Sequence, residues 1–359
     1  MQLPNHGANP HHVYAKLGIE PPDTLLDFSE NVNPAGPPQA VSDSWPALLS
    51  KLSAYPDPFG EPFLSAAANF HGVSTPYLFA GNGAAELLAL IAERYQGKKA
   101  LIVHPTFSEY EATLTAKNVE VIQIIASETD GFDLPLATIL EKMKEVSVLY
   151  LCTPNNPTGR LPTRDQLQTI VRRGAEVDCD CVFDEAFIDF VDESLSFIPE
   201  VENYPHVTVV RSMTKMYAIP GIRLGYVVAS PSIIMDIKAR APHWNVNGIA
   251  AQIGAVCLRE ETYRQQVIHQ STVERQRLTE FLRRHGCTVT DSVANFLSFK
   301  PGPHQQASKL FQDLLQQGIV LRHSENFLGM DGHWLRVGMK KEAEMTRLKE
   351  VLAIWFAEN

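Results

Sequence analysis

Short apolar runs alternate with longer amphipathic stretches along the chain from about residue 76 to residue 230. Six of the runs are brief and mostly rich in β-branched residues, at residues 100–103, 119–125, 148–152, 181–183, 207–210 and 224–228. Such runs, separated by helical patterns, are typical of βαβ units, which build a largely parallel sheet with helices on both faces. The pattern therefore predicts an α/β fold with a mostly parallel central sheet, and with its functional residues at the carboxyl ends of the strands.

The pattern changes after about residue 231. A long helical stretch over residues 247–284 carries charges on one side, and it is followed by alternating strand-like and helical segments at 288–299, 305–317, 319–323, 334–337 and 341–356. The first sixty residues have little periodicity and predict an arm with short elements. We therefore expect an N-terminal arm over residues 1–45, a large domain over 46–245, and a linking helix with a smaller α+β domain over 246–359.

The charge balance narrows the classes of partner. The chain of 359 residues has 31 Lys and Arg against 41 Asp and Glu, a formal net charge of −10. Nucleic acids and anionic membranes bind basic surfaces, so neither is expected as a partner. No secretory signal is evident at the N-terminus, and no apolar run approaches the ~20 residues that span a bilayer. A soluble, cytoplasmic protein is expected, with any anionic substrate bound by a few local cationic side chains.

The cysteines give no sign of a disulfide framework or a metal site. They are odd in number and lack paired metal-ligand spacing, at Cys152, Cys179, Cys181, Cys257 and Cys287. We interpret them as reduced structural thiols, and no metal is expected.

Two polar clusters have the composition of ligand-binding loops. Gly81-Asn82-Gly83 leads directly into an apolar helical run, and the unpaired amides of a helix N-terminus suit a phosphate; the alternative is a plain turn. Residues 153–159, Thr-Pro-Asn-Asn-Pro-Thr-Gly, follow the predicted strand 148–152. Their prolines restrict the backbone and direct side-chain amides outward, although a rigid turn without a ligand has the same composition.

Two further clusters contain titratable groups. Asp184 follows the buried strand 181–183, where a carboxylate needs a cation or several donors to stay ionised, unless it serves only as a helix cap. Lys215 follows strand 207–210 among the hydroxyls of Ser212 and Thr214, with Arg223 further along. A lysine that acts as a nucleophile or base needs desolvation or nearby cations to lower its pKa, and this neighbourhood fits an exposed surface lysine poorly.

In this order the motifs resemble the class I and II aminotransferases, which are fold-type I enzymes dependent on pyridoxal 5′-phosphate. The resemblance implies that Lys215 forms the Schiff base with the cofactor, that Asp184 binds its pyridine nitrogen and that Asn156 donates to its ring hydroxyl. Phe107 takes the place of the aromatic ring that stacks on the cofactor. The phosphate is then held by Gly83, Ala84, Ala85, Ser212, Thr214 and Arg223, and by Tyr55 from the neighbouring subunit of a homodimer.

Within this family the chain looks more similar to threonine-phosphate decarboxylases of cobalamin biosynthesis than to histidinol-phosphate aminotransferases. The supporting segments are residues 5–9, 26–34, 184–190 and 211–221, together with Phe187, where most aminotransferases of this type have Tyr. The resemblance implies a phosphorylated amino acid as substrate, bound by His6, Gly7, Asn31, Asn156, Arg322 and Arg336. Two arginines suit two anionic groups.

The expected reaction is decarboxylation of O-phospho-L-threonine to (R)-1-aminopropan-2-ol phosphate. Transamination of histidinol phosphate or a related amino acid with 2-oxoglutarate remains the alternative. A third possibility is a non-catalytic pyridoxal-binding sensor domain fused to a DNA-binding module. Such a module would need an additional basic helical domain, for which the chain has neither the length nor the charge. Two of these residues also have alternatives without substrate binding. Arg322 would form a surface salt bridge, and His6 would be a solvated residue of the arm.

Overall fold

The computed structural model describes residues 3–4 and 7–359. Its central sheet has seven strands in the order β2-β8-β7-β6-β5-β3-β4. Neighbouring strands pair in parallel except at β8, which is antiparallel to both β2 and β7. The strands are β2 (Leu78–Gly81), β3 (Lys99–His104), β4 (Glu120–Ile125), β5 (Val148–Cys152), β6 (Asp180–Asp184), β7 (Val207–Ser212) and β8 (Gly225–Ala229).

The six predicted strands fall on β3 to β8, which confirms the α/β fold. β2 was not predicted, because its four residues Leu-Phe-Ala-Gly contain no β-branched side chain. It forms part of the sheet through its antiparallel pairing with β8.

Helices cover both faces of the sheet because successive residues of its inner strands are buried on opposite sides. On β3, Leu101 belongs to one apolar core and Ile102 to another. The first core lies against α3 (Phe63–His71), α6 (Leu136–Lys142), α7 (Arg164–Val177) and α9 (Gly248–Cys257). The second lies against α4 (Ala84–Glu93), α5 (Glu109–Ala116) and α8 (Pro231–Arg240). The inner strands are therefore buried on both faces, as parallel sheets require.

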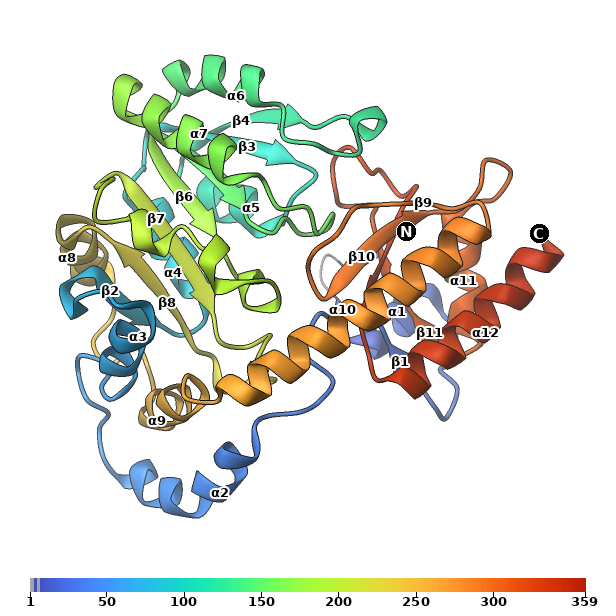
Figure 1. The fold of residues 1–359 in the computed structure, drawn as a ribbon, viewed down its shortest axis with the longest axis horizontal. Helices are drawn as coiled ribbons and strands as arrows, with labels where there is room; N and C mark the ends of the chain where they lie inside the picture. Colours follow the sequence, from blue (N-terminus) through green and yellow to red (C-terminus); the bar gives the residue numbers. More distant parts are fainter. Residues whose placement is uncertain (1–2, 5–6) are drawn as a thin grey trace.

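A second group of elements has its own apolar core. Its antiparallel sheet has the order β12-β13-β10-β9, from β9 (Thr288–Val289), β10 (Phe296–Lys300), β12 (Arg322–His323) and β13 (Leu335–Gly338). Helices α11 (Ala307–Gln316) and α12 (Glu342–Glu358) pack on it, and so does the start of the chain. There α1 (Pro10–Leu17) contributes Tyr14 to the core, and β1 (Leu26–Asp27) pairs with β11 (Ile319–Val320). The C-terminus lies in this C-terminal group (Figure 1), and Leu3, the first described residue, belongs to its core.

The prediction of one helix over residues 247–284 is wrong. The structure has two helices, α9 and α10 (Glu261–Arg284), separated by a turn at residues 258–260. The composition explains the break, since α9 is almost wholly apolar and packs within the sheet core, whereas α10 is polar on most positions. In Figure 1, α10 runs from the sheet toward the C-terminal group.

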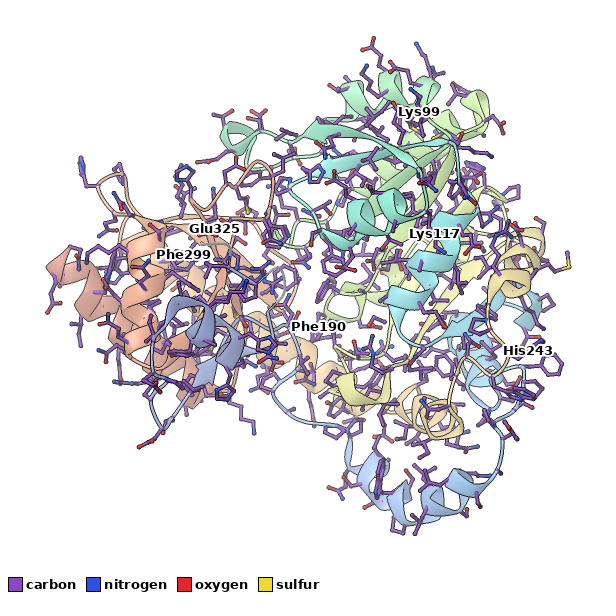
Figure 2. All side chains as sticks on the ribbon, turned by 180° about the vertical axis from the view of Figure 1, so that it is seen from behind. Lys99, Lys117, Phe190, His243, Phe299 and Glu325 are labelled. Carbon is purple, nitrogen blue, oxygen red and sulfur yellow. The ribbon has the colours of Figure 1, made fainter. Side chains whose placement is uncertain are left out.

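Figure 2 shows the same two groups from behind. Phe299 and Glu325 lie in the C-terminal group, and Lys99, Lys117 and His243 lie in the group that contains the large sheet. Phe190 lies near the junction, in η5 (Ile188–Phe190), which contacts α10. The domain boundaries given above stay a prediction. No helix within the described residues is long and apolar enough to cross a membrane.

Candidate active site

A cavity of about 490 Å³ lies where the strands of the large sheet end and the C-terminal group begins. Its lining comes from segments that are remote in sequence: the N-terminal segment, α4, the residues that follow β3, β5, β6 and β7, and the C-terminal group. Most of the predicted site residues meet there: Gly7, Asn31, Ala84, Ala85, Phe107, Asn156, Asp184, Ser212, Thr214, Lys215, Arg223, Arg322 and Arg336.

Three predicted residues are not in this lining. Gly83 is adjacent to it as the N-cap of α4. Tyr55 does not line the cavity of its own chain: it is 83% exposed and its ring lies 4.9 Å from that of Trp244. His6 lies outside the described residues.

Lys215 is positioned by the loop that follows β7. Its Nζ donates to the hydroxyl of Thr214 at 2.8 Å, and Thr214 is in turn bonded to Ser212 at 2.8 Å. Burial lowers the pKa of Lys215 to about 8, with Asp184 opposing the shift and the Arg223 and Arg336 cations adding to it. A substantial neutral fraction near pH 8 makes this amine a usable nucleophile and base.

Asp184 ends β6 and is buried. Its Oδ1 accepts from the backbone N–H of Ala186 at 3.0 Å, and its Oδ2 accepts from the hydroxyl of Tyr110 at 2.6 Å. Burial raises the pKa of Asp184, while these two hydrogen bonds and the charge of Lys215 lower it. The carboxylate therefore has donors on both oxygens and keeps lone pairs for a ligand in the cavity.

The N-terminus of α4 and Arg223 form a compact anion site. A Cβ built on Gly83 would lie 2.6 Å from Nη2 of Arg223, and one on Gly225 would lie 2.7 Å from the backbone N of Ala84. Only glycine allows this close approach. The amides at the start of a helix, a guanidinium and the nearby Ser212 and Thr214 hydroxyls are together suited to a phosphate.

The two asparagines after β5 have different surroundings. Asn155 is used within its own loop, where its amide bonds Pro105, Thr158 and Thr106. Asn156 lines the cavity, and its Oδ1 accepts from Arg336. Because this bond occupies the amide oxygen, the Asn156 amide nitrogen is left as the donor toward a ligand.

Arg322 and Arg336, which fall within the predicted strand-like segments 319–323 and 334–337, are paired directly opposite each other on β12 and β13. Arg336 Nη2 donates to the Ser29 carbonyl at 2.6 Å, and its Nε has no hydrogen-bond partner. With the Asn31 amide oriented to satisfy both of its ends, its oxygen accepts from Arg336 Nη1 at 3.1 Å. No carboxylate lies within ion-pair distance of Arg336 among the described residues. Burial, with Arg322 adding to it, lowers the pKa of Arg336 to about 9.

Arg322 is also buried and lines the cavity, and its neighbours differ from those of Arg336. It donates to Asn326 Oδ1 at 2.6 Å, and its guanidinium lies 5.1 Å from the ring centre of Phe327. Burial lowers the pKa of Arg322 to about 10, and Glu325 opposes that shift.

The lining carries an excess of positive charge in a protein that is acidic overall. It contains Lys215 and three arginines against two carboxylates, Asp184 and Glu30. Glu30 is already paired with Lys340 at 2.8 Å. The cavity is therefore suited to a ligand set with several anionic groups.

Aromatic side chains form the remaining walls. Phe107 follows β3 and lies in an edge-to-face contact with Tyr110, with ring centres 5.7 Å apart. Phe187 lines the cavity and packs edge-to-face on Phe296. Because this residue is a phenylalanine, it offers no hydroxyl to a ligand in the cavity.

Sequence reasoning missed Tyr110, Glu30 and Phe327, which all line the cavity. Tyr110 had a detectable signal, since it lies three residues after Phe107, in the turn that begins α5. Glu30 lies within a segment singled out above, but nothing in the sequence indicated its partner Lys340. No signal pointed to Phe327.

The cavity has the features that pyridoxal phosphate requires. They are a desolvated amine at Lys215, a buried carboxylate at Asp184, a glycine-lined anion site at α4 and a flanking aromatic ring at Phe107. These residues therefore fit the cofactor.

Comparison with known proteins gives concordant matches. The family described as aminotransferase class I and II matches residues 23–352. A threonine-phosphate decarboxylase of Salmonella typhimurium is 36% identical over 349 residues, covering 97% of this chain and 95% of the relative. A histidinol-phosphate aminotransferase of Trichormus variabilis is 29% identical, covering 85% of this chain and 86% of the relative. The crystal structure of the histidinol-phosphate aminotransferase from Clostridium acetobutylicum superposes with a TM-score of 0.89 at 30% identity, covering 93% of this chain and all of that one.

Proposed function

The chain belongs to the class I and II aminotransferase family and is a pyridoxal 5′-phosphate enzyme, and we propose that within this family it decarboxylates O-phospho-L-threonine. The observation that carries the proposal is the pairing of Arg322 with Arg336 on adjacent strands, both facing the cavity that contains Lys215. A substrate with a carboxylate at one end and a phosphate at the other would place an anionic group against each guanidinium. The product is 1-aminopropan-2-ol phosphate.

The cofactor would be held by residues of the large sheet and its helices. Asp184 would pair with the ring nitrogen, Asn156 would donate to the ring hydroxyl and Phe107 would cover one face. The phosphate would lie on the backbone amides of residues 83–85, with Ser212, Thr214 and Arg223. When bound, pyridoxal phosphate supplies an aldehyde that captures an amine and a ring that accepts the electron pair of the broken bond.

The chain's own residues would determine which bond breaks. Arg336, assisted by Asn31, would hold the α-carboxylate, and Arg322 would hold the phosphate with the N-terminal residues His6 and Gly7. A substrate fixed at both ends in this way would be held so that its carboxylate, and not its α-hydrogen, leaves. Lys215, whose lowered pKa allows it to exchange a proton near neutral pH, would return a proton to Cα after carbon dioxide leaves.

Transamination of histidinol phosphate is the second candidate, since several histidinol-phosphate aminotransferases are 28–30% identical to this chain. The decarboxylase is favoured by the higher identity to the Salmonella relative and by Phe187, which cannot supply the hydroxyl that most aminotransferases have there. Both substrates carry phosphate, so Arg322 alone does not distinguish them.

The test is a comparison of two assays on the purified enzyme. We expect carbon dioxide from O-phospho-L-threonine without a keto acid, and no appreciable glutamate from histidinol phosphate with 2-oxoglutarate. Glutamate without carbon dioxide would replace the decarboxylase with the aminotransferase and leave the cofactor site unchanged.

A homodimer with shared active sites is part of the proposal. Large apolar side chains are exposed along α2 (Gln39–Leu48), η1 (Leu49–Ser53) and the loop that follows: Trp45, Leu49, Leu52, Tyr55 and Phe59 are each more than half exposed. Monomeric proteins rarely expose so many neighbouring apolar side chains. Since Tyr55 does not reach the cavity of its own chain, a role at the cofactor phosphate requires a second copy.

The five buried, unpaired cysteines support a reducing, cytoplasmic setting.

A further inference from the structure

The hydroxyl of Tyr110 is the only side-chain group within the described residues that donates a hydrogen bond to Asp184. It lies 2.6 Å from Asp184 Oδ2, and both side chains are buried. The phenol remains protonated, because burial and the adjacent Asp184 charge raise the pKa of Tyr110 well above its ordinary value. Tyr110 is therefore a permanent donor to this carboxylate.

The position of Tyr110 links two parts of the cofactor site. It lies in the first turn of α5, two residues after the N-cap Ser108, while its ring packs edge-to-face on Phe107. The same side chain thus contacts the expected partner of the ring nitrogen and the expected stacking ring. A displacement of Tyr110 would move both.

We propose that Tyr110 is a positioning residue, whose hydroxyl keeps the Asp184 carboxylate ionised and oriented toward the ring nitrogen of the cofactor. The inference rests on the proposed role of Asp184. Its physical basis is that a buried carboxylate without donors takes up a proton, and a protonated Asp184 could not pair with a protonated ring nitrogen. Tyr110 and the Ala186 amide together oppose that protonation.

The chain supplies a matched control. Tyr150 lies on β5 with its ring centre 5.9 Å from that of Tyr110, it is buried, and its hydroxyl has no hydrogen-bond partner. Tyr110→Phe and Tyr150→Phe therefore remove the same atom from neighbouring buried sites. Only the first change removes a donor to Asp184.

The experiment measures the apoprotein and cofactor binding rather than turnover. The protonation midpoint of Asp184 is followed in the apoprotein by difference infrared spectroscopy, with Asp184→Asn identifying the band, and the Kd for pyridoxal phosphate is obtained by titration. Tyr110→Phe should raise the midpoint by about one to two pH units and weaken cofactor binding by about tenfold or more, as expected for one hydrogen bond to a charged group. Tyr150→Phe should change neither quantity.

Unchanged values for Tyr110→Phe would overturn the inference. If Asp184→Asn weakens binding but Tyr110→Phe does not, only the inference about Tyr110 fails. If Asp184→Asn also binds the cofactor normally, the role of Asp184 fails and the inference fails with it. Neither result depends on whether the enzyme releases carbon dioxide, so the proposed reaction is tested separately.

Discussion

Replacing Arg336 tests how the substrate carboxylate is held. In the structure, Nη1 contacts Asn156 and Nη2 donates to the Ser29 carbonyl, while Nε has no partner. A carboxylate bound by Arg336 would therefore accept a hydrogen bond from Nε, which has no other partner. It would share the two Nη groups with Asn156 and the Ser29 carbonyl. One charge-assisted hydrogen bond contributes about 1.5–3 kcal/mol, so Arg336→Ala should lower kcat/KM by about 10- to 150-fold.

The loss should appear in kcat as well as in KM, because the contact that binds the carboxylate also orients it for departure. The assay is steady-state carbon dioxide release from O-phospho-L-threonine, with cofactor content checked by absorbance. Arg336→Lys, which keeps the charge but not the planar fork, should fall between wild type and Arg336→Ala. Arg347→Ala is the control, since Arg347 is on α12, half exposed and paired with Glu350.

Two outcomes would refute this reasoning. A kcat/KM for Arg336→Ala within about threefold of wild type would show that Arg336 does not hold a substrate anion. A rise in KM with unchanged kcat would show that it binds the substrate without orienting the bond that breaks.

Three further predictions concern the cofactor, the dimer and pH. Because the pKa of Lys215 is lowered to about 8, capture of pyridoxal phosphate by the apoprotein should rise with pH to a plateau above that value, and Lys215→Ala should give no borohydride-stable adduct. Leu52→Glu should shift sedimentation toward an inactive monomer, whereas Ile354→Glu, which is also more than half exposed but lies on α12, should stay dimeric; an active Leu52→Glu monomer would contradict the shared site. Burial raises the pKa of Glu185 to about 7, so the folded state holds this proton more tightly than the unfolded state. Wild-type stability relative to Glu185→Gln should then fall, by on the order of 3 kcal/mol, as pH rises from 4.5 to 7 in chemical denaturation; a constant difference would contradict that assignment.

The sequence predicted where the strands lie along the chain better than how the strands pair in the sheet. The runs that became β3 to β8 have a strong local signal, and polar residues directly after buried parallel strands must lie at one edge of the sheet. Asp184 and Lys215 were therefore identifiable. β2 lacked that signal because its residues have no β-branched side chains, and its place depends on pairing with β8, a contact between residues far apart in sequence.

Other features depend on tertiary geometry. Asn155 and Asn156 are adjacent and chemically identical, and only the folded turn shows that Asn156 faces the cavity while Asn155 is bonded within its loop. The break between α9 and α10 has no Gly or Pro to mark it. The partner of Glu30, Lys340, is 310 residues away, and no local pattern indicates such a pair.

We propose that this enzyme removes the carboxylate of its substrate. The most direct measurement follows O-phospho-L-threonine labelled with ¹³C in its carboxyl group, incubated with the holoenzyme and no keto acid, by NMR. We expect the label to be released as carbon dioxide and bicarbonate over many turnovers, in step with unlabelled 1-aminopropan-2-ol phosphate. Label retained in a keto acid, with conversion stopping after one equivalent per active site, would contradict it.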